Sequence, residues 1–175
     1  MKSLRMIVLL LAVPLLPTHG ALGEGDGREL RARLTGFQET PLTLASSARG
    51  QFLATISKDE TSIDFQLSYQ GFDTDVGAAH IHLGRPATSG GVTIFLCGGG
   101  GRPACPVRTE IVQGTITAAN VIAIPAQDLA AGDLARVIMA IRAGATYANV
   151  HSVKHPGGEI RGQILTGHSS SPGGC

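Results

Sequence analysis

Aromatic and charged side chains are both scarce in this sequence. Phe, Tyr and Trp make up 4% of the 175 residues and Trp is absent, so the core has to be built mainly from Ile, Val, Leu and Ala. Charged residues make up 15% of the chain and the net charge is +1, which argues against a polyanionic partner. Nucleic-acid binders usually carry a basic stripe with stacking aromatics, and neither is visible. The composition therefore predicts that nucleic acid is not a partner.

Long apolar runs are absent beyond the first residues of the chain. Two basic residues precede an apolar stretch over 6–16, and small and helix-breaking residues follow it. This arrangement predicts a secretory signal peptide over 1–20, cleaved near Gly20 or Ala21, and the run is too short to span a membrane. We therefore expect a secreted or periplasmic protein whose mature form has no membrane span.

Cysteine is rare as well, and its three copies fall into two groups. Cys97 and Cys105 flank a loop that contains four consecutive glycines, whereas Cys175 ends a Ser/Gly/Pro-rich tail. The glycines let the short loop fold back, and an oxidising compartment favours disulfides, so a Cys97–Cys105 bridge is predicted. Two free thiols and a metal site are the alternatives, but the spacing is unlike that of a zinc knuckle. Cys175 is either free or paired between molecules.

Glycine is abundant, with 24 copies, and apolar residues often alternate with polar ones. Alternation of this kind is typical of half-buried strands joined by tight turns. The segment 92–97 is almost continuously apolar and is predicted to be a central strand. The period changes to helical spacing at Leu134, Val137, Ile138 and Ile141, after Asp133 as a capping residue. Strands are expected over 30–35, 50–57, 61–69, 78–83, 92–97, 111–117, 146–152 and 159–165.

These elements predict an all-β fold of one domain. The expected architecture is a Greek-key β-sandwich or barrel, similar to superoxide dismutase or immunoglobulin folds, with one short helical crossover near 126–143. The domain is expected over 28–166, after a linker over 21–27. A disordered tail is expected over 167–175, because its composition is of low complexity.

Three histidines are the strongest candidates for chemistry. His80 and His82 lie one residue apart in a predicted strand, so their side chains share one face at roughly 7 Å. His151 lies in a second predicted strand, and the three imidazoles converge if the two strands are neighbours. Imidazole suits copper, zinc, iron and nickel, and the affinity order favours copper(II). His155 is a further candidate ligand, and the alternative is that the histidines only form hydrogen bonds in a polar pocket.

Polar residues near the end of the chain are candidates for the surroundings of this cluster. Asn149 shares a strand face with His151, and Glu159 and Arg161 share a face of the last strand. A buried ion pair between Glu159 and Arg161, or between one of them and an earlier aspartate, would fix the last strand against the histidine strand. A catalytic carboxylate is the alternative interpretation.

Several segments resemble the CHRD family, a domain named for its occurrence in chordin. The motif Gly-Ala-Ala-His-Ile-His-Leu-Gly over 77–84 and the motif Pro-Gly-Gly-Glu-Ile-Arg-Gly-Gln-Ile over 156–164 carry most of the resemblance, together with segments 95–106 and 140–152. The resemblance extends from about Arg28 to Thr166. It implies a secreted β-sandwich domain whose biochemical role in bacteria is poorly defined.

The same two motifs are also similar to strands of copper-zinc superoxide dismutases. That resemblance implies copper ligation by His80 and His82 and an anion-guiding role for Arg161. The loop over 85–91 is too short to supply the zinc ligands of that family, so a zinc site is not expected.

The predicted function is an exported, non-catalytic binding domain that holds copper through His80, His82 and His151. A copper-only redox enzyme similar to superoxide dismutase is one alternative. A structural or adhesive extracellular module without a metal is the other. The expected partner is a metal ion or an unidentified extracellular or periplasmic molecule.

Overall fold

The computed structural model describes residues 27–108 and 110–167. The predicted signal peptide, and almost all of the predicted linker and tail, lie outside these residues. Within the described ranges, no helix is both long enough and apolar enough to cross a bilayer.

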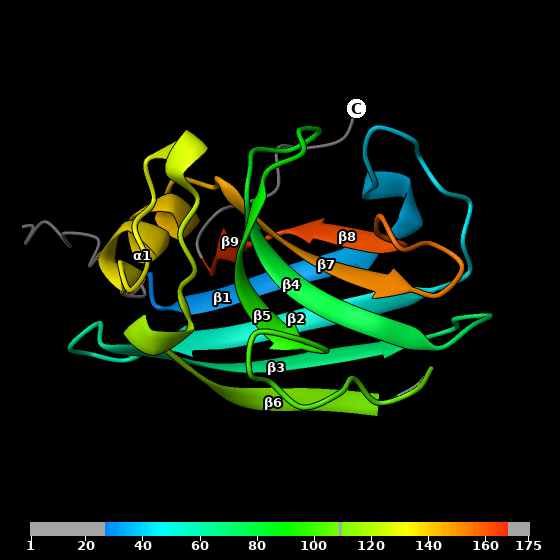
Figure 1. Cartoon of the computed structure of the whole chain (residues 1–175), viewed down its shortest axis with the longest axis horizontal. Helices are drawn as coiled ribbons and strands as arrows, with labels where there is room; N and C mark the ends of the chain where they lie inside the picture. The colour runs from blue at the N-terminus through cyan, green and yellow to red at the C-terminus, as the bar shows by residue number, and fades with distance from the viewer. Residues whose placement is uncertain (1–26, 109, 168–175) are drawn as a thin grey trace, which may run out of the picture.

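In the described part of the chain, nine antiparallel strands form one sheet that curls into a nearly closed barrel (Figure 1). Every predicted strand is present, and the segment predicted over 159–165 is divided into two short strands. The all-β fold with a sandwich or barrel architecture is therefore confirmed. In spatial order the strands are β5 (Gly91–Cys97), β4 (Val76–Leu83), β7 (Thr146–Ser152), β8 (Ile160–Gln163), β1 (Glu29–Thr35), β2 (Arg49–Ile56), β3 (Ser62–Gln70) and β6 (Glu110–Thr117), with β9 (Leu165–Thr166) paired to β1.

The barrel interior is aliphatic, as the composition requires. In β1, Leu30, Ala32 and Leu34 are buried, whereas the residues between them are exposed or half-buried. The same alternation in β2 and β3 brings Phe52 and Phe65 together inside the barrel, with ring centroids 6.2 Å apart. Burial of each such side chain contributes roughly 1.5–3 kcal/mol, so the alternation fixes which face of each strand points inward.

The only α-helix among the described residues, α1 (Leu134–Arg142), forms as predicted. Its apolar residues are buried on one face, and the Asp133 side chain accepts a hydrogen bond of 3.0 Å from the backbone N–H of Arg136. Such an N-terminal cap satisfies a backbone donor that has no partner within the helix. Three short 3-10 segments accompany it: η1 (Gly36–Gln38), η2 (Ala118–Asn120) and η3 (Pro125–Gln127).

The prediction that segment 92–97 is a central strand is wrong, because β5 ends the strand order. Its apolar character has another cause. Ile94 and Leu96 belong to the core, and Phe95 lies under the following loop, where a Cβ atom at Gly99 or Gly100 would come within 2.6 Å of the Phe95 ring. A strand that is covered on both faces has a continuous apolar sequence, whether it lies in the centre or at the end of the sheet.

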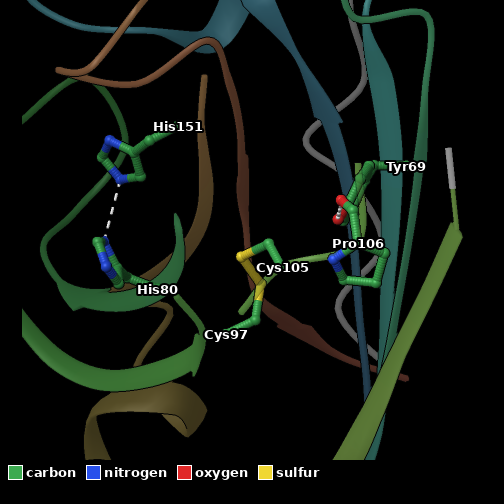
Figure 2. The surroundings of a disulfide bond; sticks show 6 residues. All are labelled: Tyr69, His80, Cys97, Cys105, Pro106 and His151. Carbon is green, nitrogen blue, oxygen red and sulfur yellow. Dashed lines mark hydrogen bonds between the residues drawn. A yellow bond between two sulfur atoms is a disulfide. The ribbon is translucent and has the colours of Figure 1, made fainter. Parts of the chain in front are cut away.

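A disulfide between Cys97 and Cys105 closes the loop after β5, as predicted (Figure 2). The loop joins the two ends of the strand order. Arg102 donates a hydrogen bond of 2.8 Å to the carbonyl of Thr115 on β6, and the Tyr69 hydroxyl on β3 donates one of 2.5 Å to the carbonyl of Pro106. The cross-linked loop therefore links the edge of β5 to β3 and β6.

Replacing both Cys97 and Cys105 by Ser should lower the free energy of unfolding by about 2–3 kcal/mol, because a loop of this length regains its closure entropy in the unfolded chain. Urea unfolding followed by circular dichroism measures the change. Wild-type protein treated with a reductant is the matched control and should lose the same amount. Equal stability of the oxidised wild type and the double variant would contradict the prediction.

Candidate metal centre

The outer face of β4, β7 and β8 carries a buried layer of polar side chains. Ala79 and Ile81 of β4 point into the core, and strand alternation turns their neighbours His80 and His82 to the other face. Both histidines are nevertheless only 8% exposed, because loops cover this side of the barrel. Solvent is thus largely excluded from side chains that would face water on an ordinary sheet surface.

The pairing of β4 with β7 brings the three predicted histidines together. His80 lies opposite Asn149, and Ala78 lies opposite His151. The Nδ1 atom of His80 is 3.1 Å from the Nε2 atom of His151 (Figure 2). The ring centroids of His82 and His151 are 6.0 Å apart. One nitrogen from each of the three rings lies within 4.8 Å of the other two. The predicted convergence of the imidazoles is therefore confirmed.

Backbone carbonyls fix two of the three rings. The Nδ1 atom of His82 is 3.0 Å from the carbonyl oxygen of Gly90, and the Nδ1 atom of His151 is 3.0 Å from that of Pro156. A carbonyl only accepts, so each Nδ1 carries a proton and donates it, and each Nε2 keeps its lone pair. Metal-ligating histidines are usually oriented in this way by a hydrogen bond from their second nitrogen.

Two other ring nitrogens of the cluster have no hydrogen-bond partner among the described residues. Because Nε2 of His151 can only accept, the Nδ1 atom of His80 donates to it, which leaves Nε2 of His80 with a lone pair. The Nε2 atoms of His80 and His82 are buried and have no hydrogen-bond partner among the described residues. Buried polar atoms normally have a partner, so these two nitrogens are available to a ligand or an ion.

Burial keeps the cluster neutral. It is the largest cause that lowers the pKa of His80 to about 3 and that of His82 to about 4, and it also lowers the pKa of His151. The neighbouring imidazoles add to the effect at His80, since one protonated ring disfavours the charge of another. Neutral imidazole is the form that binds metals, so the cluster is in its binding form at neutral pH.

Two aromatic side chains pack against the cluster. Tyr147 stacks on His82 with centroids 4.7 Å apart and an angle of 6°, and Phe95 meets His80 edge to face at 4.5 Å. Neither residue was predicted from the sequence to lie at this site. Strand alternation could have found Tyr147, because it precedes Asn149 by two positions and therefore shares its face.

The expected surroundings of the cluster are only partly as predicted. The ion pair between Glu159 and Arg161 is wrong, because the two carboxylate oxygens of Glu159 accept from the hydroxyls of Ser46 and Ser152. Arg161 instead donates to the Thr40 hydroxyl at 2.8 Å. Neither Asp64 nor Asp75 replaces the missing partner, since the described residues place both in other contacts. Two hydroxyls stabilise the buried carboxylate without requiring a buried cation beside it.

Asn149 also has a role that the sequence did not indicate. Its Nδ2 atom donates to Glu39 at 2.5 Å and to the carbonyl of Ile160 at 3.0 Å, rather than to a histidine. His155 lies outside the three-histidine group and lines a separate cavity with Lys154 and Glu159. Glu39 was not foreseen, because its loop carries no periodic pattern and it contacts Asn149 only through the tertiary fold.

Comparison with known proteins supports one of the two resemblances. The family model described as the CHRD domain matches residues 30–164. No curated protein and no solved structure matches the chain, so the likeness to superoxide dismutase stays a prediction.

The lowered histidine pKa values predict a loss of stability on acidification. Between about pH 6.5 and pH 4 the unfolded chain binds protons at His80 and His82 while the folded chain does not, so the free energy of unfolding falls by up to about 1.4 kcal/mol per pH unit for each histidine. The loss from His82 levels off below about pH 4 and the loss from His80 below about pH 3, where the folded rings also bind protons. Urea unfolding from pH 7 to pH 4 measures the slope.

A double variant with His80→Gln and His82→Gln should show a much flatter acid slope than the wild type. Burial raises the pKa of Glu39, which contributes a slope of the opposite sign, but this contribution is common to both proteins and cancels in the comparison. His155→Gln is the control, because that residue lies outside the cluster. An unchanged slope in the double variant would show that the buried rings do not control the acid response.

Proposed function

The chain belongs to the CHRD family, and we propose that its three-histidine cluster makes it a non-catalytic domain that binds one transition-metal ion outside the cytoplasm. The observation that carries the proposal is the pair of buried Nε2 atoms of His80 and His82 that have no partner among the described residues. A metal ion at the cluster supplies an electron-pair acceptor for the Nε2 atom of His82 and for a ring nitrogen of His80. The disulfide supports a location in an oxidising compartment.

The distances fit a site that closes slightly when it is filled. An ion held at about 2.0–2.1 Å by two imidazole nitrogens requires those nitrogens to lie at most about 4.2 Å apart. Nδ1 of His80 and Nε2 of His151 already meet this limit at 3.1 Å, whereas the whole set spreads to as much as 4.8 Å. The carbonyls of Gly90 and Pro156 hold the rings of His82 and His151, so the His80 ring, which no carbonyl holds, is the one that is free to adjust.

Copper(II) is the ion that the donor set favours. Three neutral imidazoles suit copper, zinc and nickel, and among divalent ions the affinity for such nitrogen sites is highest for copper. The described residues place no carboxylate or thiolate in the group, so the site contributes no negative charge to attract harder ions. His80 can give either nitrogen, because a proton displaced from its Nδ1 moves to the otherwise unpartnered Nε2.

The chain's own residues would prepare the site rather than carry out a reaction. The Gly90 and Pro156 carbonyls hold two rings as Nδ1–H tautomers, Tyr147 and Phe95 restrict ring motion, and the covering loops exclude water. A bound ion would supply Lewis acidity and, if it is copper, redox chemistry. We infer that carriage or buffering of the ion, rather than turnover, is the role of the domain.

Calorimetric titration of metal-free protein with copper(II) should give one site that depends on all three histidines. His82→Gln should weaken binding by at least about tenfold, since loss of even a supporting contact has an effect of that size. Electron paramagnetic resonance should show nitrogen hyperfine structure from imidazole. Copper(II) at 100 times its Kd should stabilise the fold by about 2.7 kcal/mol.

The control variant is His155→Gln, which removes an imidazole outside the group and should bind like the wild type. Zinc(II) and nickel(II) titrations rank the ions. Absence of saturable binding of any of the three ions would overturn the proposal. Equal binding by wild type and a variant with all three cluster histidines replaced by Gln would do the same, because the ion would then bind elsewhere.

A further inference from the structure

A cavity other than the one lined by His155 lies beside the buried polar layer, between the segment that contains η1 and the loop after β4. We call it the second cavity. Its volume is about 590 Å³, and none of the three cluster histidines lines it. Its floor comes from Arg161 and Gln163 of β8, and its walls include Phe37, Thr40 and Pro86. The cavity is therefore distinct from the candidate metal centre, because its strand residues lie on β8, whereas the histidines lie on the neighbouring strands β4 and β7.

Arg161 is a buried cation without a direct counter-ion. Arg161 is only 3% exposed. Its guanidinium donates to the Thr40 hydroxyl at 2.8 Å and to the Arg85 carbonyl at 3.0 Å. Its Cζ atom lies 3.5 Å from the centroid of the Tyr147 ring. All of these partners are neutral, and no described carboxylate lies within 4.0 Å of the guanidinium. A buried charge in this state is costly, and an anion beside it would offset the cost.

Gln163 gives a second, independent sign of a ligand in the same cavity. Its Nε2 atom donates to the carbonyls of Gly84 at 3.0 Å and Gly144 at 2.7 Å, which fixes the orientation of the amide. The Oε1 atom is thereby also fixed, and it is buried without a hydrogen-bond partner among the described residues. A ligand hydroxyl or amino group would satisfy this acceptor.

Glu39, which also lines the cavity, does not take the place of the anion. Its Oε1 atom accepts from Asn149 at 2.5 Å, and its charge attracts that of Arg161 only from beyond the distance of a direct ion pair. Burial raises the pKa of Glu39, which favours its neutral form and weakens its competition for the guanidinium.

The walls of the cavity indicate an organic rather than an inorganic anion. Phe37, which is 68% exposed, and two prolines give the cavity an apolar wall. A planar carbon skeleton would cover this surface, while a carboxylate suits the forked donors of a guanidinium. We propose that the cavity binds a small hydroxylated organic carboxylate, with Arg161 as its charge partner and Gln163 Oε1 as the acceptor for its hydroxyl group.

Titration of the full chain with 4-hydroxybenzoate, followed by NMR or calorimetry, tests the proposal. We expect saturable 1:1 binding, at least tenfold weaker binding of the neutral isostere 4-hydroxybenzamide, and weaker binding of inorganic phosphate. Equal binding of the amide would remove the role of charge. Equal binding of phosphate would show that the site accepts any anion, and it would overturn the proposal of an organic ligand.

Two variants test the location of the site. Arg161→Gln should abolish binding, and because Arg161 is buried, Thr43→Trp provides a second variant that fills the cavity from an exposed position on its wall. Arg49→Gln is the charge-matched control, since it removes an exposed arginine outside this cavity, and it should bind like the wild type. Binding that survives Thr43→Trp, or no saturable binding to the wild type, would overturn the proposal.

The same variants separate this inference from the proposed metal function. Thr43→Trp should keep the copper(II) affinity of the wild type, because Thr43 does not belong to the histidine group. Loss of carboxylate binding with intact copper binding is therefore the expected result. Failure of copper binding in the wild type would leave the carboxylate result unaffected.

Discussion

The register between β4 and β7 is the constraint on which both the histidine cluster and the buried polar layer depend. It sets His80 opposite Asn149 and Ala78 opposite His151, so that the three imidazoles come together on the outer face. A slip of one residue would turn the histidines into the aliphatic interior and the alanines outward. The core therefore fixes the cluster indirectly, because Ala79, Ile81 and their counterparts in β7 fit only one face of the pairing.

The cover over this layer is made of loops, which supply groups that a sheet surface lacks. Carbonyls of Gly90 and Pro156 orient two imidazoles, and hydroxyls of Ser46 and Ser152 hold the buried carboxylate of Glu159. The covering loop comes so close to Asn149 that position 158 has to be a glycine. Gly158 has a φ of +126°, and a Cβ there would come within 2.6 Å of the Asn149 amide oxygen. A residue with a side chain would displace the loop from the layer it covers.

Tyr147 lies where the two candidate sites meet. Its ring stacks on His82 of the metal centre and carries the guanidinium of Arg161 from the second cavity. Aromatic and cation–π contacts of this kind contribute roughly 0.5–2 kcal/mol each, so the ring holds both side chains in place while keeping them apart. One sheet face thus presents two kinds of chemistry, with an electron-pair donor set on one side and a positive charge on the other.

The sequence by itself determined the strands, the helix with its Asp133 cap, the Cys97–Cys105 closure and the shared face of His80 and His82. These features follow from local periodicity and spacing, which the chain carries whatever its tertiary fold. Only the tertiary structure decided that β5 lies at an end of the sheet, because burial on both faces looks alike in a central strand and in an edge strand covered by a loop. It also decided that Glu159 binds serines, that Arg161 has no direct counter-ion and that Glu39 joins the layer. These contacts connect residues far apart in the chain, and their partners depend on how loops without periodicity fold over the sheet.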